Sequence, residues 1–267
     1  MVPPRKPRCA WLSPQGAKKH LGRSGGVCVL RVLVVVAATL PTLALAEPQW
    51  VGRFPTAGEL PAPWQIEQLN KDIPPTRYRL RDWDGVAAVE AHAVKSMALL
   101  ARPLEVDLGK TPILCWRWRV EAPLKSADMM TKAGDDYAAR VYLSFEVPPE
   151  SLGLGTRVAL GLARSVRGGN IPDAAINYIW DNRHPVGTWQ PNAYTDRARM
   201  LVLRSGATDA GRWVVERRHV SADFQQAFGH APAKLTGLAL ASDTDNTGEE
   251  ARAGFADFRF VAKDDDC

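Results

Sequence analysis

Two short acidic segments carry the side chains best suited to binding a metal ion. Asp243 and Asp245 stand at the first and third positions of a run, DTDNTG, that copies the opening of a calcium-binding loop. At the twelfth position Gly254 replaces the bidentate glutamate, and strand-like residues flank the run, so an EF-hand is excluded. Two interpretations remain: a calcium site of another geometry, completed by Asp135 or Asp136, or a tight hairpin whose side chains accept hydrogen bonds from local backbone N–H groups.

The same carboxylates are candidates for acid–base chemistry. Asp135 and Asp136 are adjacent, and adjacent side chains of an extended chain point in opposite directions, so they cannot both face one bond. A glycosidase needs two carboxyl groups about 5 to 9 Å apart across the scissile bond. The competing interpretation is structural, because acids at strand ends commonly form ion pairs. The sequence does not place a second carboxyl group, and the candidates are Glu146, Glu216, Asp243 and Asp257.

Arginines alternate with apolar residues along two strand-like segments. In residues 113–120, Trp116 and Trp118 share one face and are expected in the core, whereas the arginines between them share the other. If residues 138–147 form a neighbouring strand, one polar sheet face results, and it either binds a ligand or is solvated and paired with acids, Glu216 among them. The residues expected on that face are Arg117, Arg119, Arg140 and Tyr142.

Aromatic side chains form a third candidate site. Eight tryptophans follow residue 46, and the segment Asn177–Trp180 precedes a polar stretch that contains Trp189 and Tyr194. Exposed aromatic rings stack on sugar rings, and nearby amide and charged groups hydrogen-bond the hydroxyls. Most tryptophans are packing residues in proteins, so the core is the alternative place for them. The ligand-binding candidates here are Asn177, Trp180 and Tyr194.

The elements that must position these residues are short strands. Proline and glycine recur at short intervals, and between them lie runs of period two or of continuous apolar character, which favours an all-β, two-sheet antiparallel sandwich. One short helix is expected over residues 221–228, with Ser221 as its N-cap and Gly229 as its C-cap. Strands are expected over residues 78–83, 86–91, 96–102, 113–120, 138–147, 158–163, 175–180, 199–204, 213–220, 235–241 and 254–261.

The first 46 residues have the features of an export signal. Seven basic residues precede or enter an apolar stretch that ends in Ala44-Leu45-Ala46, the small-x-small pattern of a secretory cleavage site. Its uninterrupted apolar part has about 15 residues, fewer than the ~20 that span a bilayer, and no second apolar span follows. We therefore expect a cleaved signal peptide over residues 1–46, one domain over 47–267, a periplasmic or secreted location and no membrane span after cleavage. The alternative is an uncleaved N-terminal anchor.

Charge and cysteine content narrow the classes further. The chain has 34 basic and 29 acidic residues, but residues 1–46 hold seven of the basic and none of the acidic ones, which leaves a net charge of −2 for the rest. Nucleic-acid binding is therefore not expected. An oxidising compartment permits a disulfide between Cys115 and Cys267, but the core-like setting of Cys115 and a mobile-looking acidic tail favour unpaired thiols. No nucleophile elbow, zinc motif or phosphate loop occurs.

Four ordered motifs resemble a known family. These are the segments 116–120 (WRWRV), 132–142 (KAGDDYAARVY), 177–180 (NYIW) and 242–248 (SDTDNTG). In that order they resemble the bacterial exported family catalogued as domain of unknown function 3047, over about residues 47–261. The resemblance implies an exported protein with a jelly-roll-like sandwich similar to carbohydrate-binding modules. It implies no settled activity and transfers no catalytic residue.

The sequence thus favours an exported sandwich that binds a polysaccharide or other envelope glycan without transforming it. Its supporting loop, or calcium site, would contain Asp135, Asp136, Asp243 and Asp245. One alternative is an envelope polysaccharide hydrolase or lyase that uses the same carboxylates. The other is a structural envelope protein that binds a protein partner through an exposed apolar patch.

Overall fold

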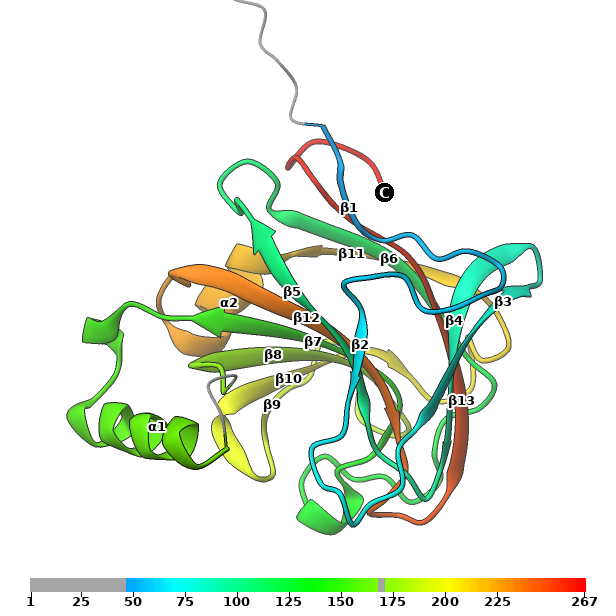
Figure 1. The fold of residues 1–267 in the computed structure, drawn as a ribbon, viewed down its shortest axis with the longest axis horizontal. Coiled ribbons are helices and arrows are strands. Elements are labelled where there is room, and N and C mark those ends of the chain that lie inside the picture. Colours follow the sequence, from blue (N-terminus) through cyan, green and yellow to red (C-terminus); the bar gives the residue numbers. More distant parts are fainter. Residues whose placement is uncertain (1–46, 168–170) are drawn as a thin grey trace, which may run out of the picture. The chain divides into compact units, whose positions relative to one another are not determined.

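The alternation of apolar and polar residues produces two sheets, each with one apolar face that must be buried. The computed structural model describes residues 47–167 and 171–267 (Figure 1); the expected signal peptide lies outside these residues. The six-stranded sheet has the order β11-β6-β13-β4-β3, with β1 paired to β13. Its strands are β1 (Gln49–Gly52), β3 (Arg77–Trp83), β4 (Val86–Val94), β6 (Ile113–Val120), β11 (Val214–His219) and β13 (Glu250–Val261).

The second sheet has seven strands in the order β2-β5-β12-β7-β8-β10-β9. All pairs in both sheets are antiparallel except β8 with β10, which are parallel because the chain returns through the short edge strand β9. The all-β two-sheet fold class is confirmed. Its strands are β2 (Gln65–Glu67), β5 (Leu99–Val106), β7 (Tyr137–Glu146), β8 (Ala174–Asp181), β9 (Trp189–Asn192), β10 (Thr195–Ser205) and β12 (Lys234–Asp243).

Aromatic rings fill the space between the two sheets. Trp116 packs edge-on against Trp118 at 5.7 Å between ring centroids, and the ring of Tyr178 is stacked on Trp116 at 5.4 Å. Trp118 in turn contacts Trp180 at 5.7 Å. All four side chains are almost fully buried, and burying a large apolar side chain stabilises the fold by about 1.5 to 3 kcal/mol. The expected core position of Trp116 and Trp118 is confirmed.

The helices differ from the expectations in part. The predicted strand over 158–163 is wrong, because these residues belong to helix α1 (Leu154–Arg167) in the long β7–β8 connection, which also contains the 3₁₀ turn η2 (Pro149–Ser151). A short apolar run does not distinguish a strand from a helix by periodicity alone. The expected second helix is confirmed as α2 (Val220–Phe228) with Gly229 as C-cap, but the N-cap is His219, whose ring accepts from the backbone N–H of Ala222.

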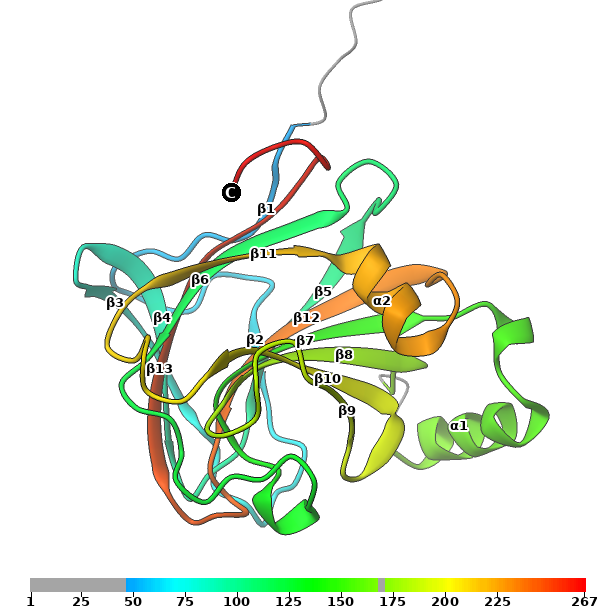
Figure 2. The same ribbon diagram turned by 180° about the vertical axis from the view of Figure 1, so that it is seen from behind.

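Helix α2 lies across one end of the sandwich (Figure 2). Its Phe224 is fully buried and contacts Phe145 of β7 at 4.6 Å, so the helix closes the core at that end. The sequence analysis missed β1, β2 and β9, which are edge strands of three or four residues and too short for a period of two to be detected. Among the described residues, none of the helices is long and apolar enough to cross a membrane.

A disulfide joins Cys115 of β6 to Cys267, the last residue, with 5.5 Å between the two Cα atoms. The expectation of unpaired thiols is therefore wrong. The tail after β13 folds back over β6, where Arg217 of β11 donates to the backbone carbonyl groups of Lys263 and Asp265. These contacts hold the tail where Cys267 can reach the buried thiol.

The disulfide encloses a large part of the chain, since its cysteines are 152 residues apart. Cross-links of this kind typically contribute about 2 to 4 kcal/mol by restricting the unfolded chain. Urea unfolding should therefore show Cys267→Ser to be less stable than the wild type by about that amount, and the reduced wild type should match the variant. Equal midpoints for the oxidised wild type, the reduced wild type and the variant would contradict this role.

Candidate functional site

A buried arginine lies on the outer face of the seven-stranded sheet. Alternation in β7 sends Val141 and Leu143 into the core and Arg140 and Tyr142 to the outer face. The Arg140 guanidinium is only 4% exposed. It donates from Nη2 to Asp135 at 2.8 Å, pairs through Nη1 with Asp243 at 3.1 Å, and donates from Nη1 to the Tyr142 hydroxyl. One guanidinium thus connects three segments of the chain.

Carboxylates outnumber cations around Arg140. Asp135, Asp136 and Asp243 are 6%, 0% and 2% exposed, and among the described residues the Arg140 guanidinium is the buried cation that pairs with two of them, Asp135 and Asp243. Burial removes water from Asp243, and the nearby Asp136 and Asp135 repel a further negative charge. Desolvation first, and this repulsion second, raise the pKa of Asp243 to about 8, although the ion pair with Arg140 opposes the shift.

Two loops meet at the carboxylates. Asp136 accepts from the backbone N–H of Thr247 at 2.6 Å and from the side-chain amide of Asn246 at 3.1 Å, so it anchors the β12–β13 loop. The β6–β7 connection, which includes the 3₁₀ turn η1 (Lys132–Gly134), lies beside that loop (Figure 1). Gly134 permits this arrangement, because a Cβ atom there would come within 2.6 Å of the backbone nitrogen of Asp128. The DTDNTG run does form the turn between β12 and β13, but the backbone N–H groups of Asn246 and Thr247 donate to Asp136 of the neighbouring loop and not, as the hairpin interpretation expected, to the side chains of the run.

The network continues to the surface through polar side chains. Asn192 of β9 donates to Asp135 at 2.9 Å. Tyr194, in the turn after β9, donates its hydroxyl at 3.2 Å to the side-chain carbonyl of Asn246, and its ring is 56% exposed. Lys132 lies over that ring at 5.2 Å from the centroid. We call this continuous set the Arg140 network; its members are Asp135, Asp136, Arg140, Tyr142, Asn192, Tyr194, Asp243 and Asn246.

A row of residues beside the network crosses the whole sheet. Residues paired across strands share one face, and the row contains Tyr142 together with its cross-strand partners Ala239 and Asn177. At the usual strand spacing of about 4.8 Å, seven strands extend over roughly 29 Å. The complete row, from β2 to β9, is Gln65, Ala101, Ala239, Tyr142, Asn177, Met200 and Gln190.

The adjacent row on the same face consists of small residues. Ser144 is central to it, and its neighbours on either side are glycine, proline or alanine. These residues are all partly or fully exposed, so this part of the outer face is open to solvent. We call the two rows together the Tyr142 face. The small residues are Pro103, Gly237, Ser144, Ala175 and Ala198.

Three of the predicted ligand-binding residues lie elsewhere. The expected shared face of Arg117, Arg119, Arg140 and Tyr142 is wrong, because β6 belongs to the six-stranded sheet and β7 to the other. Arg117 pairs with Asp257, and Arg119 is buried, pairs with Asp84 and lies over the Trp83 ring at 4.4 Å. Trp180 is 1% exposed and donates to the Gly206 carbonyl group, so it is a core residue.

The remaining candidates do gather. Arg140, Tyr142 and Tyr194 belong to the Arg140 network together with three of the four predicted acids. The fourth, Asp245, is partly exposed near Asp136, and burial raises the pKa of Asp245. Asn177 of β8 adjoins Tyr142, and its buried side-chain carbonyl oxygen has no hydrogen-bond partner among the described residues. Asn192, Asn246 and Met200 were missed. Asn246 belongs to the motif of residues 242–248, which could have identified it, but nothing in the sequence marks the edge strand that carries Asn192.

The carboxylates do not form a metal cage in the described part of the chain. No group of three or more His, Cys, Asp or Glu side chains there is arranged to hold a metal ion. The oxygens of Asp135, Asp136 and Asp243 are instead used by Arg140 and by N–H donors. Of the calcium ligands expected at Asp135, Asp136, Asp243 and Asp245, the first three thus have other partners.

The acids considered as partners for hydrolysis are dispersed. Glu146 is exposed and lies at the far end of β7 from Asp135. Glu216 is buried on β11, where it accepts from Trp118 Nε1 at 2.9 Å and from Arg204 at 2.6 Å. Asp257 is held by Arg117 on the other sheet. These three acids do not belong to the Arg140 network; the fourth candidate, Asp243, does, and it is buried and paired with Arg140.

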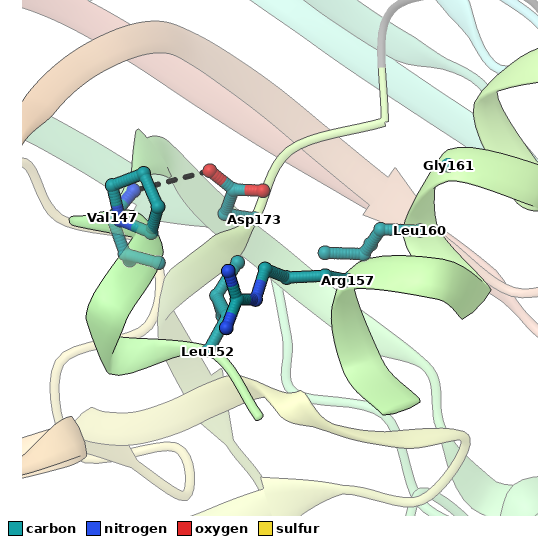
Figure 3. Close-up of a pocket in the computed structure, with 7 residues that line it drawn as sticks. Val147, Leu152, Arg157, Leu160, Gly161 and Asp173 are labelled. Carbon is teal, nitrogen blue, oxygen red and sulfur yellow. Dashed lines mark hydrogen bonds between the residues drawn. The ribbon is translucent and has the colours of Figure 1, made fainter. Parts of the chain in front are cut away.

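A cavity of about 240 Å³ lies between α1 and the end of β7 (Figure 3). Its lining is mainly apolar, and in Figure 3 the Arg157 side chain extends from α1 toward Leu152. Asp173 lies at its edge and accepts from the backbone N–H of Val147 at 3.1 Å. This cavity is at the opposite end of β7 from Asp135 and shares no residue with the Arg140 network.

Removing the central cation tests the network. Arg140→Met leaves the buried carboxyl groups of Asp135 and Asp243 without their guanidinium, and loss of one partner of a buried ion pair costs about 3 to 5 kcal/mol. The matched change Arg117→Met breaks a partly exposed pair and should cost about 0 to 1 kcal/mol. Urea unfolding near neutral pH measures both. Equal, small losses for the two variants would show that the network does not stabilise the fold.

The Asp243 proton gives a second test. The folded state keeps this proton up to about pH 8, whereas an ordinary aspartate loses it near 3.8. Between these values the folded state binds more protons, so this group makes the free energy of unfolding fall as pH rises. Asp243→Asn removes the contribution, and its unfolding free energy should decline less than that of the wild type across the window. Parallel pH profiles for the two proteins would disprove the assignment.

Three solved structures are similar to this chain at low identity. The family 30 carbohydrate-binding module of a cellulosomal cellulase of Clostridium thermocellum is 9% identical, with 83% of this chain and 95% of that chain covered and a TM-score of 0.37. The xyloglucanase domain of NopAA from Sinorhizobium fredii is 9% identical, with 80% of this chain and 93% of that chain covered and a TM-score of 0.33. A thermostable variant of the cellulase Cel12A of Rhodothermus marinus is 10% identical, with 81% of this chain and 100% of that chain covered and a TM-score of 0.38. These scores carry no functional argument.

A family model matches most of the length of this chain. None of the curated proteins matches the chain significantly. The model of one family, described as Protein of unknown function (DUF3047), matches residues 62–259, which include all of the Arg140 network and most of both sheets. This match agrees with the resemblance carried by the four sequence motifs. The chain therefore belongs to the DUF3047 family.

Proposed function

We propose that the protein binds a glycan on the Tyr142 face and does not transform it. The observation that carries the proposal is the composition of this face. A partly exposed aromatic ring, Tyr142, lies beside an open row of small residues, and the amides of Gln65 and Gln190 lie at the two ends of its own row. Aromatic rings stack on the apolar faces of sugars, and amides hydrogen-bond their hydroxyls.

The extent and rigidity of this face suit a polymer. The open row of small residues crosses five strands, roughly 19 Å at the usual spacing, and accommodates an extended chain of sugar rings better than one small molecule. Tyr142 is held by Arg140, which is itself fixed by two carboxylates. A ring that is already ordered loses little conformational entropy on binding, so preorganisation favours affinity.

The carboxylates support binding rather than hydrolysis. A general acid must reach the glycosidic oxygen, and a second carboxyl group must stand across the bond. Asp136 and Asp243 are almost fully buried and accept hydrogen bonds from the protein. The carboxylates of the Arg140 network therefore orient the site, and the bound glycan leaves unchanged.

We also propose that the protein acts outside the cytosol, in the periplasm or after secretion. The signal-like residues 1–46 and the disulfide between Cys115 and Cys267 support this location, since disulfides persist in oxidising compartments. N-terminal sequencing of the protein from its native host checks it. The expected first residue is Glu47, and a chain that begins at Met1 would contradict cleavage.

Tyr142 variants test the binding face. Tyr142→Ala removes the stacking surface and should weaken binding to the best ligand in a panel of soluble bacterial and plant polysaccharides by at least about tenfold, or about 1.4 kcal/mol. Tyr142→Phe keeps the ring and should retain most of the affinity. Trp50→Ala, which removes a partly exposed ring from the other sheet, is the matched control. Affinity electrophoresis and calorimetry measure the binding, and size analysis of the glycan checks that no product forms.

A blocking variant separates lost binding from lost folding. Ala175→Trp adds bulk to the open small row and leaves Tyr142 and its hydrogen bonds in place. It should reduce binding while the thermal unfolding midpoint stays near that of the wild type. Undiminished binding by both Tyr142→Ala and Ala175→Trp would place the ligand elsewhere, and shortened glycan chains would favour the hydrolase.

A further inference from the structure

A small cavity of about 190 Å³ lies at the edge of the seven-stranded sheet, between β9, β10 and α2. Trp189 and Arg199 lie on the face of the sheet that points toward the core. Trp189 pairs with Leu201 and Arg199 with Ile176, and Leu201 and Ile176 are both core residues. The cavity is therefore separated from the Tyr142 face by the sheet itself. It is lined by Trp189, Gln190, Pro191, Arg199, Gln226 and Ala227.

Arg199 is the unusual residue in this lining. Within the described chain its guanidinium forms no ion pair or hydrogen bond, and its Nε is buried without a partner. The guanidinium carbon lies 5.8 Å from the centroid of the Phe228 ring, near the limit for a cation–π interaction. Nearby Arg204 and Arg218, by contrast, pair with Glu216 and Asp223. A half-buried cation without a counter-charge is costly unless a ligand supplies one.

Two further groups in the lining are free to bind a ligand. Among the described residues, the side-chain amide of Gln226 and the indole N–H of Trp189 form no hydrogen bond with the protein, whereas Gln190 pairs with Met200 and so directs its side chain to the other side of the sheet. The cavity thus combines one cation, one amide and one aromatic ring. Its volume is below the ~300 Å³ at which pockets for drug-sized ligands begin, which fits a single sugar ring.

We propose that this cavity binds one carboxylate-bearing sugar ring, a uronate. The Arg199 guanidinium receives the carboxylate, since its fork of N–H groups matches the two carboxylate oxygens. The amide of Gln226 hydrogen-bonds ring hydroxyls, and Trp189 supplies an apolar surface. This site goes beyond the binding function of the Tyr142 face and does not depend on it.

The test compares an acidic with a neutral sugar of the same ring. The purified full-length protein is titrated with galacturonate and with galactose, followed by calorimetry and tryptophan fluorescence. Galacturonate should bind at least about tenfold more tightly, and high salt should reduce this preference. Arg199→Gln should abolish it. Arg77→Gln, which makes the same charge change at an exposed position on β3, is the matched control and should keep it.

Further arms separate the outcomes. Gln226→Ala, a change at an exposed position of α2, should weaken galacturonate binding without loss of thermal stability, which keeps the test valid if Arg199→Gln folds poorly. Tyr142→Ala should leave galacturonate binding unchanged, so failure of this site is distinct from failure of the Tyr142 face. Binding of tri-galacturonate as well as the monomer indicates a polymer-bound uronate, and binding of the monomer alone indicates a free sugar acid; both support the site. No preference for galacturonate, or equal competition by acetate, overturns the proposal.

Discussion

The guanidinium of Arg140 is the contact on which the candidate site depends. It lies in a nearly water-free position on the outer side of β7, and it connects Asp135 from the β6–β7 loop, Asp243 at the end of β12 and the Tyr142 hydroxyl. A buried cation of this kind requires counter-charges, and buried carboxylates require it in return. The two loops are held against the sheet by this mutual requirement, and the Tyr142 ring is positioned as a consequence.

The two outer faces of the sandwich differ in how their charges are used. On the six-stranded sheet, Glu90 accepts from Arg79, Arg81 and Arg252, so several arginines share one nearly buried carboxylate. That face is covered by its own ion pairs. On the seven-stranded sheet the charges gather at one end, in the Arg140 network, and the small residues of the Tyr142 face stay open. The open face is therefore the one that a ligand can occupy without first displacing ion pairs.

The sequence predicted the strands better than their partners. A period of two identified β6 and β7 and the faces of Trp116 and Arg140, because alternation is a local property. Which strands pair is decided by contacts across the core, and so Arg117 was placed beside Arg140 although the two lie on different sheets. The same alternation contained an unused signal: Ile176, Tyr178 and Trp180 share one face of β8, which marks Trp180 as a core residue.

Contacts between segments far apart in the chain were the second source of error in the sequence analysis. The clustering of Asp135, Asp136 and Asp243 was anticipated from their acidic character, but their use by Arg140 and by backbone N–H groups depends on two loops that are about a hundred residues apart in the chain. The disulfide to Cys267 likewise depends on the tail folding back over β6. Neither arrangement has a local pattern from which it could be read.

The most direct test of the central claim is a map of backbone amide shifts in the protein by nuclear magnetic resonance as a bound oligosaccharide is added. Binding on the Tyr142 face predicts that the largest shifts fall on the outward residues of β12, β7 and β8, with Tyr142, Ser144 and Ala175 among them. Shifts confined to the outer face of the six-stranded sheet, around Arg117 and Trp83, would contradict the account.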